Sequence, residues 1–124
     1  TDGPDAIKYP ALWEHKMLGE KAFKDVQAKG VVESKPVYAA QMAVYQGYMN
    51  LMENPAIFPA INANTMELYA EAVPFDVHRA NDMTGKAMDI IKATEVGEQM
   101  PRIAVKSDSW ACRWCDFHTI CWGE

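Results

Sequence analysis

Three groups of residues in this sequence have types and spacings that could do chemistry. The first is Glu14-His15-Lys16, at the end of the apolar run that starts at Ala11. Alternate side chains of an extended strand share a face, so the Glu14 carboxylate and the Lys16 ammonium should converge on one point. A carboxylate can bind a divalent cation and an ammonium can position or activate a water molecule, which suits metal-assisted hydrolysis. The alternative is an ion pair on a solvated face.

The second group is Gln41 and Tyr45, which lie four residues apart in a segment of helical pattern. Side chains at this spacing are neighbours on one helical face, so the Gln41 amide and the Tyr45 hydroxyl would lie side by side as hydrogen-bonding groups on long side chains. The alternative is an exposed Gln41 and a core Tyr45 ring with its hydroxyl at the surface.

The third group consists of Cys112, Cys115 and Cys121. Two thiolates separated by two residues can grip one metal centre from a tight turn, and a third nearby closes most of its coordination sphere. The fourth ligand is either a cysteine outside this chain, which gives an iron–sulfur cluster, or His118, which gives a three-cysteine, one-histidine zinc site. Three unrelated buried thiols are the alternative. The neighbouring aromatic residues would shield such a centre from water or form ordinary core: Trp110, Trp114, Phe117 and Trp122.

Periodicity and turn residues predict the elements that must position these groups. We expect a strand over residues 11–16, a helix over 20–29 ended by Gly30, a helix from Pro36 to about Met52, a hairpin of strands 56–62 and 66–73, and a helix over 75–97. The expected apolar side of the long helix consists of Val37, Ala40, Val44, Tyr48 and Leu51. The order predicts a mixed α/β or α+β fold. Because the first strand needs a pairing partner, we expect an N-terminally incomplete copy of that fold.

Composition sets the broad class of the protein. The chain has 124 residues, of which 49% are hydrophobic and 23% charged, so we expect one modest core in a folded domain. We expect no membrane span and no signal peptide, because apolar runs are shorter than about 20 residues and the first residues are polar and acidic. A net charge of −5 provides no broad positive field for nucleic acid. The odd, tight cysteine cluster indicates metal ligation in a reducing compartment rather than a disulfide framework.

Taken in order, these three groups resemble the RecB-like branch of the PD-(D/E)xK nuclease superfamily. The resemblance is closest to phage-type exonucleases, whose pattern is similar to the phrases Ala11-Leu12-Trp13-Glu14-His15-Lys16 and Ser34-Lys35-Pro36-Val37-Tyr38-Ala39-Ala40-Gln41-Met42 here. The cysteine segment resembles that of a bacterial helicase–nuclease and of CRISPR-associated adaptation nucleases that carry an iron–sulfur cluster. The resemblance to this nuclease family implies an α/β, restriction-endonuclease-like core with a mixed central sheet flanked by helices.

The resemblance assigns a role to each residue of the first two groups. Glu14 would be a ligand of Mg²⁺ or Mn²⁺, the carbonyl of His15 a further metal contact, and Lys16 the catalytic lysine. Gln41 and Tyr45 would orient the lysine and contact the DNA backbone.

The family pattern also has parts that this sequence does not show. Its metal-binding aspartate ends the strand before the glutamate; we favour a position upstream of Thr1, with Asp2 as second choice over Asp5. The three cysteines would hold three corners of a [4Fe–4S] cluster, whose fourth ligand in these relatives precedes the nuclease core. We therefore expect residues 1–109 to be a nuclease core without its N-terminal helix and first strands, residues 110–124 to be a metal-binding tail packed on it, and this polypeptide alone to be inactive.

The implied activity is metal-dependent hydrolysis of DNA in phage biology, recombination or repair, in the cytoplasm of a bacterial or phage-infected cell. DNA would be the partner, with no membrane involved, and a second copy or a recombination protein as further candidates. The basic residues nearest the site would be Lys16, Lys21, Lys24, Lys29 and Lys35. The alternatives are a noncatalytic nucleic-acid or protein binding module on the same fold, and a small zinc-stabilised binding domain.

Overall fold

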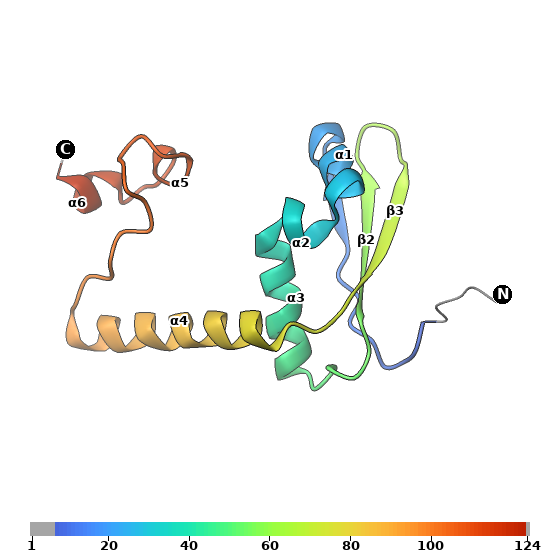
Figure 1. Ribbon diagram of the computed structural model, residues 1–124. Coiled ribbons are helices and arrows are strands. Elements are labelled where there is room, and N and C mark those ends of the chain that lie inside the picture. The colour runs from blue at the N-terminus through green and yellow to red at the C-terminus, as the bar shows by residue number, and fades with distance from the viewer. Residues whose placement is uncertain (1–6, 124) are drawn as a thin grey trace. The chain divides into compact units, whose positions relative to one another are not determined.

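The computed structural model describes residues 7–123 (Figure 1). Its elements are β1 (Lys16–Leu18), α1 (Glu20–Lys29), α2 (Val31–Ser34), α3 (Pro36–Tyr48), β2 (Ala56–Asn62), β3 (Leu68–Val73), α4 (Val77–Val96), α5 (Trp110–Arg113) and α6 (His118–Trp122). They form a mixed α/β structure with two compact units, Thr1–Lys86 and Ala87–Glu124. The division falls inside α4, earlier than the boundary expected at residue 109.

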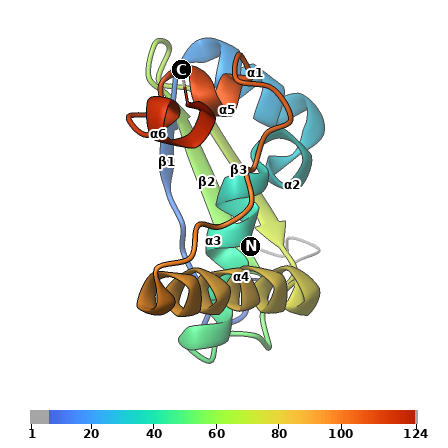
Figure 2. The ribbon, with the colours of Figure 1, turned by 90° about the vertical axis from the view of Figure 1, so that its left-hand side faces the viewer.

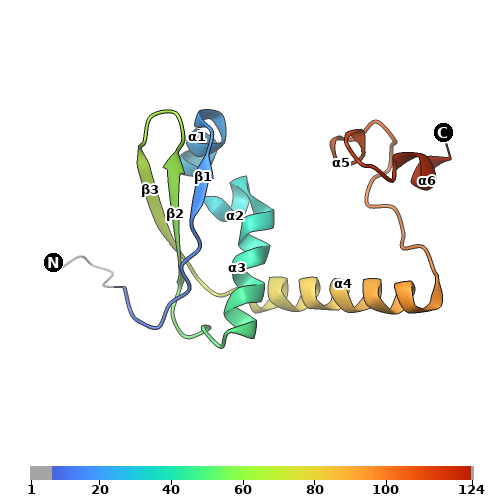
Figure 3. The ribbon, with the colours of Figure 1, turned by 180° about the vertical axis from the view of Figure 1, so that it is seen from behind.

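The first unit is built on a three-stranded mixed sheet in the order β1-β2-β3 (Figure 3). β1 runs parallel to β2, with Lys16 opposite Ala60, and β2 runs antiparallel to β3, with Phe58 opposite Glu71. A parallel pair needs a crossover connection, which α1, α2 and α3 supply. The predicted hairpin is confirmed, because β2 and β3 are adjacent in sequence and antiparallel.

The first strand begins later than the sequence predicted. Its regular part starts at Lys16, and the residues before it touch β2 only through a bridge between Trp13 and Ile57. Two hydrogen bonds keep this segment extended: Glu14 N donates to Ile57 O (3.0 Å), and Ile57 N donates to Leu12 O (2.7 Å). Glu14 and Lys16 therefore lie before and at the start of β1, not at its far end.

The helices α1, α2 and α3 lie on one face of the sheet (Figure 2). The core lies between this face and the helices, and consists of Leu12, Leu18, Phe23, Val26, Val31, Met42, Ala56, Phe58, Ala60 and Val73. The α1 prediction is confirmed, since the helix runs from Glu20 to Lys29 with Phe23 and Val26 fully buried and Gly30 at its C-cap. Gly30 has a φ of +79°, which glycine adopts without strain.

The predicted buried side of α3 was wrong. Val37 and Tyr48 are 74% and 75% exposed. The buried residues of the helix are Ala39, Met42, Ala43 and Gln46. Apolar residues occur on two sides of this helix, so its periodicity allows two faces, and the small alanines with Met42 fit against the sheet.

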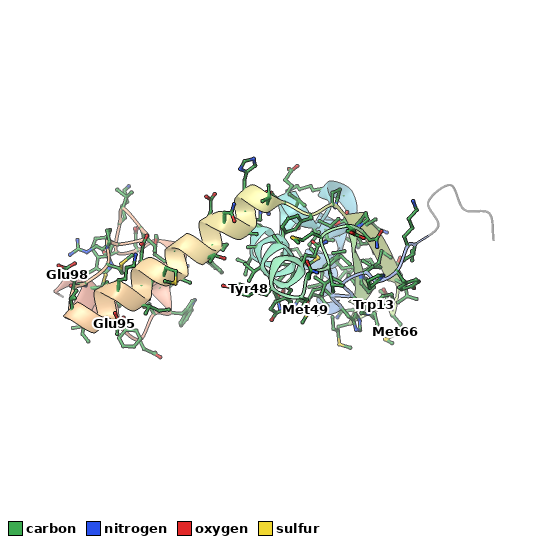
Figure 4. The ribbon with its side chains drawn as sticks, turned by 90° about the horizontal axis from the view of Figure 1, so that it is seen from below. Trp13, Tyr48, Met49, Met66, Glu95 and Glu98 are labelled. Carbon is green, nitrogen blue, oxygen red and sulfur yellow. The ribbon has the colours of Figure 1, made fainter. Side chains whose placement is uncertain are left out.

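The end of α3 explains how a glutamine is accommodated in the core. The helix ends at Tyr48, before the predicted Met52, and Asn50 takes a left-handed φ of +56°. Gln46 Nε2 donates to Leu51 O (3.3 Å) and Asn54 O (3.1 Å), so the buried amide holds the turn that follows the helix. Figure 4 shows Tyr48 at this end of α3.

Strand β3 keeps the predicted alternation, but the apolar side chains of Leu68, Ala70 and Ala72 face away from the helices, whereas Val73 lies in the core. Leu68 is 75% exposed, whereas Tyr69 and Glu71 are partly buried among the helices. Glu71 accepts hydrogen bonds from Val31 N and from the Tyr69 hydroxyl (2.8 Å). Burial first, and then this bond to Glu71, raise the pKa of Tyr69 to about 12. Trp13 and Met66 are also exposed (Figure 4).

The second unit begins at Ala87, in the middle of α4. The helix predicted over residues 75–97 is confirmed by α4. Gly97, with a φ of +71°, ends it. The expected irregular stretch follows, before two short helices, α5 and α6, that were not predicted. None of the described helices combines the length and the apolar character that crossing a membrane requires.

Candidate functional site

The acidic and basic side chains at the start of β1 meet, as the alternation of the strand predicts. Lys16 Nζ lies 2.6 Å from Glu14 Oε1, and both side chains are largely buried, with 23% and 12% of their surface exposed. Lys16 pairs in register with Ala60, a core residue, so the two charged groups lie on the helix-covered face of the sheet. A largely buried ion pair needs further hydrogen bonds to offset the loss of water.

Helix α3 supplies those further contacts. Lys16 Nζ donates to Gln41 Oε1 (3.1 Å), and Gln41 Nε2 donates to the Tyr45 hydroxyl oxygen (3.2 Å). A continuous chain of polar contacts thus runs from Glu14 through Lys16 and Gln41 to Tyr45. Two segments 25 residues apart in sequence build it, and the half-exposed Tyr45 lies at its open end.

Tyr38 belongs to the same cluster and was missed in the sequence. Lys16 Nζ lies 4.8 Å from the centre of the Tyr38 ring, within the range of a cation–π contact. The Tyr38 ring also stacks with the ring of Phe58, whose centre lies 6.3 Å away. The signal was present in the helical spacing, since Tyr38, Gln41 and Tyr45 follow at three and four residues and share one side of α3.

This arrangement places a hard oxygen ligand beside a fixed ammonium. The Glu14 carboxylate has the donor chemistry that Mg²⁺ and Mn²⁺ prefer. Within residues 7–123 no three His, Cys, Asp or Glu side chains gather closely enough to hold a metal ion, so the described residues supply Glu14 as a candidate ligand but no complete ligand set. Asp2 and Asp5 lie outside the described residues. The His15 side chain is exposed, and the role of its carbonyl stays a prediction.

The chain was compared with models of protein families, with curated proteins and with solved structures. No match was found in any of the three comparisons.

The cysteines of the second unit are not arranged as a metal site. Cys112, in α5, is buried; Cys115 is exposed; and Cys121, in α6, is partly buried. Over the described part of the chain they form no three-ligand group, either with one another or with His118. His118 Nε2 instead lies 3.1 Å from Ser107 O. As they stand, these side chains do not fit a cluster or a zinc ion.

The aromatic residues beside the cysteines do not shield a centre from water. Trp110 and Trp114 are each 85% exposed, and Phe117 is also exposed. Trp122 is the exception, because it is partly buried and the Arg102 guanidinium lies 4.4 Å from its ring centre. Arg102 Nε also donates to Cys121 O (2.9 Å), so this pair fixes α6 to the preceding irregular segment.

Proposed function

We propose that this chain carries the catalytic residues of a metal-dependent DNA nuclease, similar to the exonucleases of the RecB-like PD-(D/E)xK group. One observation supports the proposal most strongly: the Lys16 ammonium lies between the Glu14 carboxylate and the Gln41 amide. Burying an acid, an amine and an amide together carries a desolvation cost. Such groups from separate elements are therefore often found together at functional sites. It also joins the two sequence signals that carry the resemblance.

Each residue has a distinct part in the proposed hydrolysis. A divalent cation, when bound, lowers the pKa of a water molecule and polarises the phosphodiester. Glu14 contributes a carboxylate oxygen to that cation. Lys16 positions the attacking water and places positive charge where negative charge develops on the phosphate. Gln41 fixes the Lys16 side chain, and Tyr45 offers a hydroxyl to the DNA backbone.

The direct test of this proposal uses the protein as it is encoded in its genome. Linear duplex DNA should be degraded in the presence of Mg²⁺, and EDTA should stop the degradation. DNA binding without degradation would favour the second candidate, a noncatalytic binding module on the same fold. The net charge of −5 and the lack of a complete acidic ligand group among residues 7–123 favour that candidate.

Tyr38 is proposed as a positioning residue for Lys16. Tyr38→Leu should lower kcat about tenfold, because a partly desolvated cation–π contact contributes about 1 to 2 kcal/mol. KM should stay nearly constant, and Tyr38→Phe should restore kcat because it keeps the ring. Steady-state cleavage of labelled DNA measures both constants. NMR gives a second readout, since the ring shifts the Lys16 ε-methylene signal and only the Leu variant should lose that shift.

The cysteine segment is proposed, separately, to bind a metal after rearranging. The number and spacing of Cys112, Cys115 and Cys121 support this proposal, although their present geometry does not. We expect iron and sulfide, with absorption at about 400 nm, from a [4Fe–4S] cluster. One zinc per chain would instead indicate a site completed by His118 and support the zinc-stabilised binding domain. Metal analysis of anaerobically purified protein decides between them, and metal-free protein that keeps its fold would contradict both.

A further inference from the structure

A groove with three lysines among its lining residues lies in the first unit, along α1 and the segment before α3. It encloses about 640 Å³ and is lined by Lys21, Ala22, Lys24, Asp25, Ala28 and Lys35. Three of the lining residues are lysines and one is an aspartate, so the lining residues carry a net charge of +2 in a chain whose net charge is −5. Such a local excess of positive charge attracts anions against the sign of the whole molecule.

The lysines of the groove are weakly engaged within the protein. Among residues 7–123, no ion-pair partner lies within 4.0 Å of the Lys21 ammonium. Lys24 pairs with Glu20 at the surface (2.5 Å), and Lys35 reaches Asp25 only at 3.7 Å. The exposed Lys24–Glu20 pair contributes little free energy, so the Lys24 ammonium can exchange it for another anion.

Asp25 is occupied by other partners and sets the position of the groove. Hydrogen bonds from Lys29 and then from Ser34 lower the pKa of Asp25 to about 2, so it stays charged at neutral pH. Lys29 lies 2.8 Å from Asp25 Oδ1, nearer than Lys35 is to the other oxygen. The carboxylate therefore joins α1 to α2, and its contact with Lys35 is the longer of its two ion pairs.

The groove and the proposed site share the start of α3. Lys35 directly precedes this helix, and its carbonyl accepts a hydrogen bond from Tyr38 N (2.9 Å). The Tyr38 ring in turn contacts Lys16. The backbone of Lys35 therefore lies about one helical turn, roughly 5 Å along the axis, before that of Tyr38, whose ring contacts Lys16.

We propose that this groove binds the phosphodiester backbone of a nucleic-acid strand, with Lys21 and Lys35 as its principal contacts. The inference rests on the proposed function and extends it by naming the residues that hold the strand. A backbone is favoured because it offers successive phosphates to ammonium groups on both α1 and the segment before α3. Lys24 would contribute after release from Glu20.

The test separates binding from cleavage. Affinity for a fluorescein-labelled DNA duplex is measured by anisotropy in EDTA at several salt concentrations, using the protein as encoded. The variant is Lys21→Gln with Lys35→Gln. The control is Lys86→Gln with Lys92→Gln, which removes two exposed ammonium groups of α4 and changes the net charge equally.

We expect the salt dependence of binding to weaken only in the groove variant. Its slope of log K against log salt should fall by about 2, since each phosphate contact contributes about 0.9. An equal fall in the control would overturn the inference, and so would absence of DNA binding by the wild type. Asp25→Asn removes the negative charge among the lining residues of the groove and should tighten DNA binding. Weaker DNA binding by this variant would contradict the inference.

The same experiment distinguishes this inference from the proposed function. If the wild type binds DNA through Lys21 and Lys35 but never cleaves it, the nuclease proposal fails and the groove stands. If the wild type cleaves DNA with Mg²⁺ while the groove variant binds normally, the groove proposal fails and the nuclease stands.

Discussion

Glu14→Gln should lower Mg²⁺-dependent DNA degradation on the order of a thousandfold, while DNA binding in EDTA stays within about twofold. Glutamine has the shape of glutamate and can still accept a hydrogen bond from Lys16, so the surrounding structure should persist. It lacks the negative charge that a divalent cation requires. The loss should therefore appear in kcat, and initial rates at saturating DNA measure it.

A matched surface variant separates this effect from a general loss of charge. Glu53→Gln removes the same charge from an exposed position between α3 and β2 and should cleave DNA at the wild-type rate. Cleavage by Glu14→Gln at more than about a tenth of the wild-type rate would show that this carboxylate is not a metal ligand.

Lys16 should act as one unit with Glu14. Because their charged atoms lie 2.6 Å apart, Lys16→Met should cause a loss similar to that of Glu14→Gln, and the double variant should lose little more. Independent effects that multiply would mean that the two side chains serve different sites. The double-variant rate is measured in the same assay.

Local rules predicted each half of this site, but not their meeting. Strand alternation put Glu14 and Lys16 on one side, and helical spacing put Gln41 beside Tyr45. Nothing in either pattern brings Lys16 to Gln41, because that contact depends on the crossover from β1 to α3. The resemblance supplied the expectation instead. Tyr38 was missed because an aromatic residue in an apolar helix is usually read as core.

The elements of the fold were more predictable than their orientations. Helix α1 and the β2–β3 hairpin follow from local periodicity and turn residues, and both were confirmed. The exposed side of β3 was not foreseeable from alternation alone. Glu71 faces the helices because its partners, Val31 N and the Tyr69 hydroxyl, satisfy the carboxylate, and one of them lies 40 residues away.

Spacing alone could not give the geometry of the cysteines. Two cysteines at a separation of two residues suit a tight ligating turn, but the same residues also form helical turns. Here Cys112 lies in α5 and Cys121 in α6, and different hydrogen bonds hold the two short helices. The positions of the sulfur atoms therefore depend on how these helices pack, which the pattern does not specify.

Phe58→Ala should destabilise the first unit by about 3 to 5 kcal/mol in the free energy of unfolding. Phe58 is fully buried on β2, the central strand, and its ring packs on Tyr38. Removal leaves a cavity beneath the ring that supports Lys16. Since whole domains of this kind are stable by about 5 to 15 kcal/mol, much of the total would be lost.

Urea denaturation followed by circular dichroism measures this loss, and Leu68→Ala is its control. Leu68 lies on the neighbouring strand β3, but 75% of its surface is exposed on the other face of the sheet, so its replacement should change stability by less than about 0.5 kcal/mol. If Leu68→Ala cost as much as Phe58→Ala, the outer face of the sheet would be part of a packed interior. If Phe58→Ala cost less than about 1 kcal/mol, Phe58 would not be the centre of the core, and the support of Tyr38 and Lys16 would have to come from elsewhere.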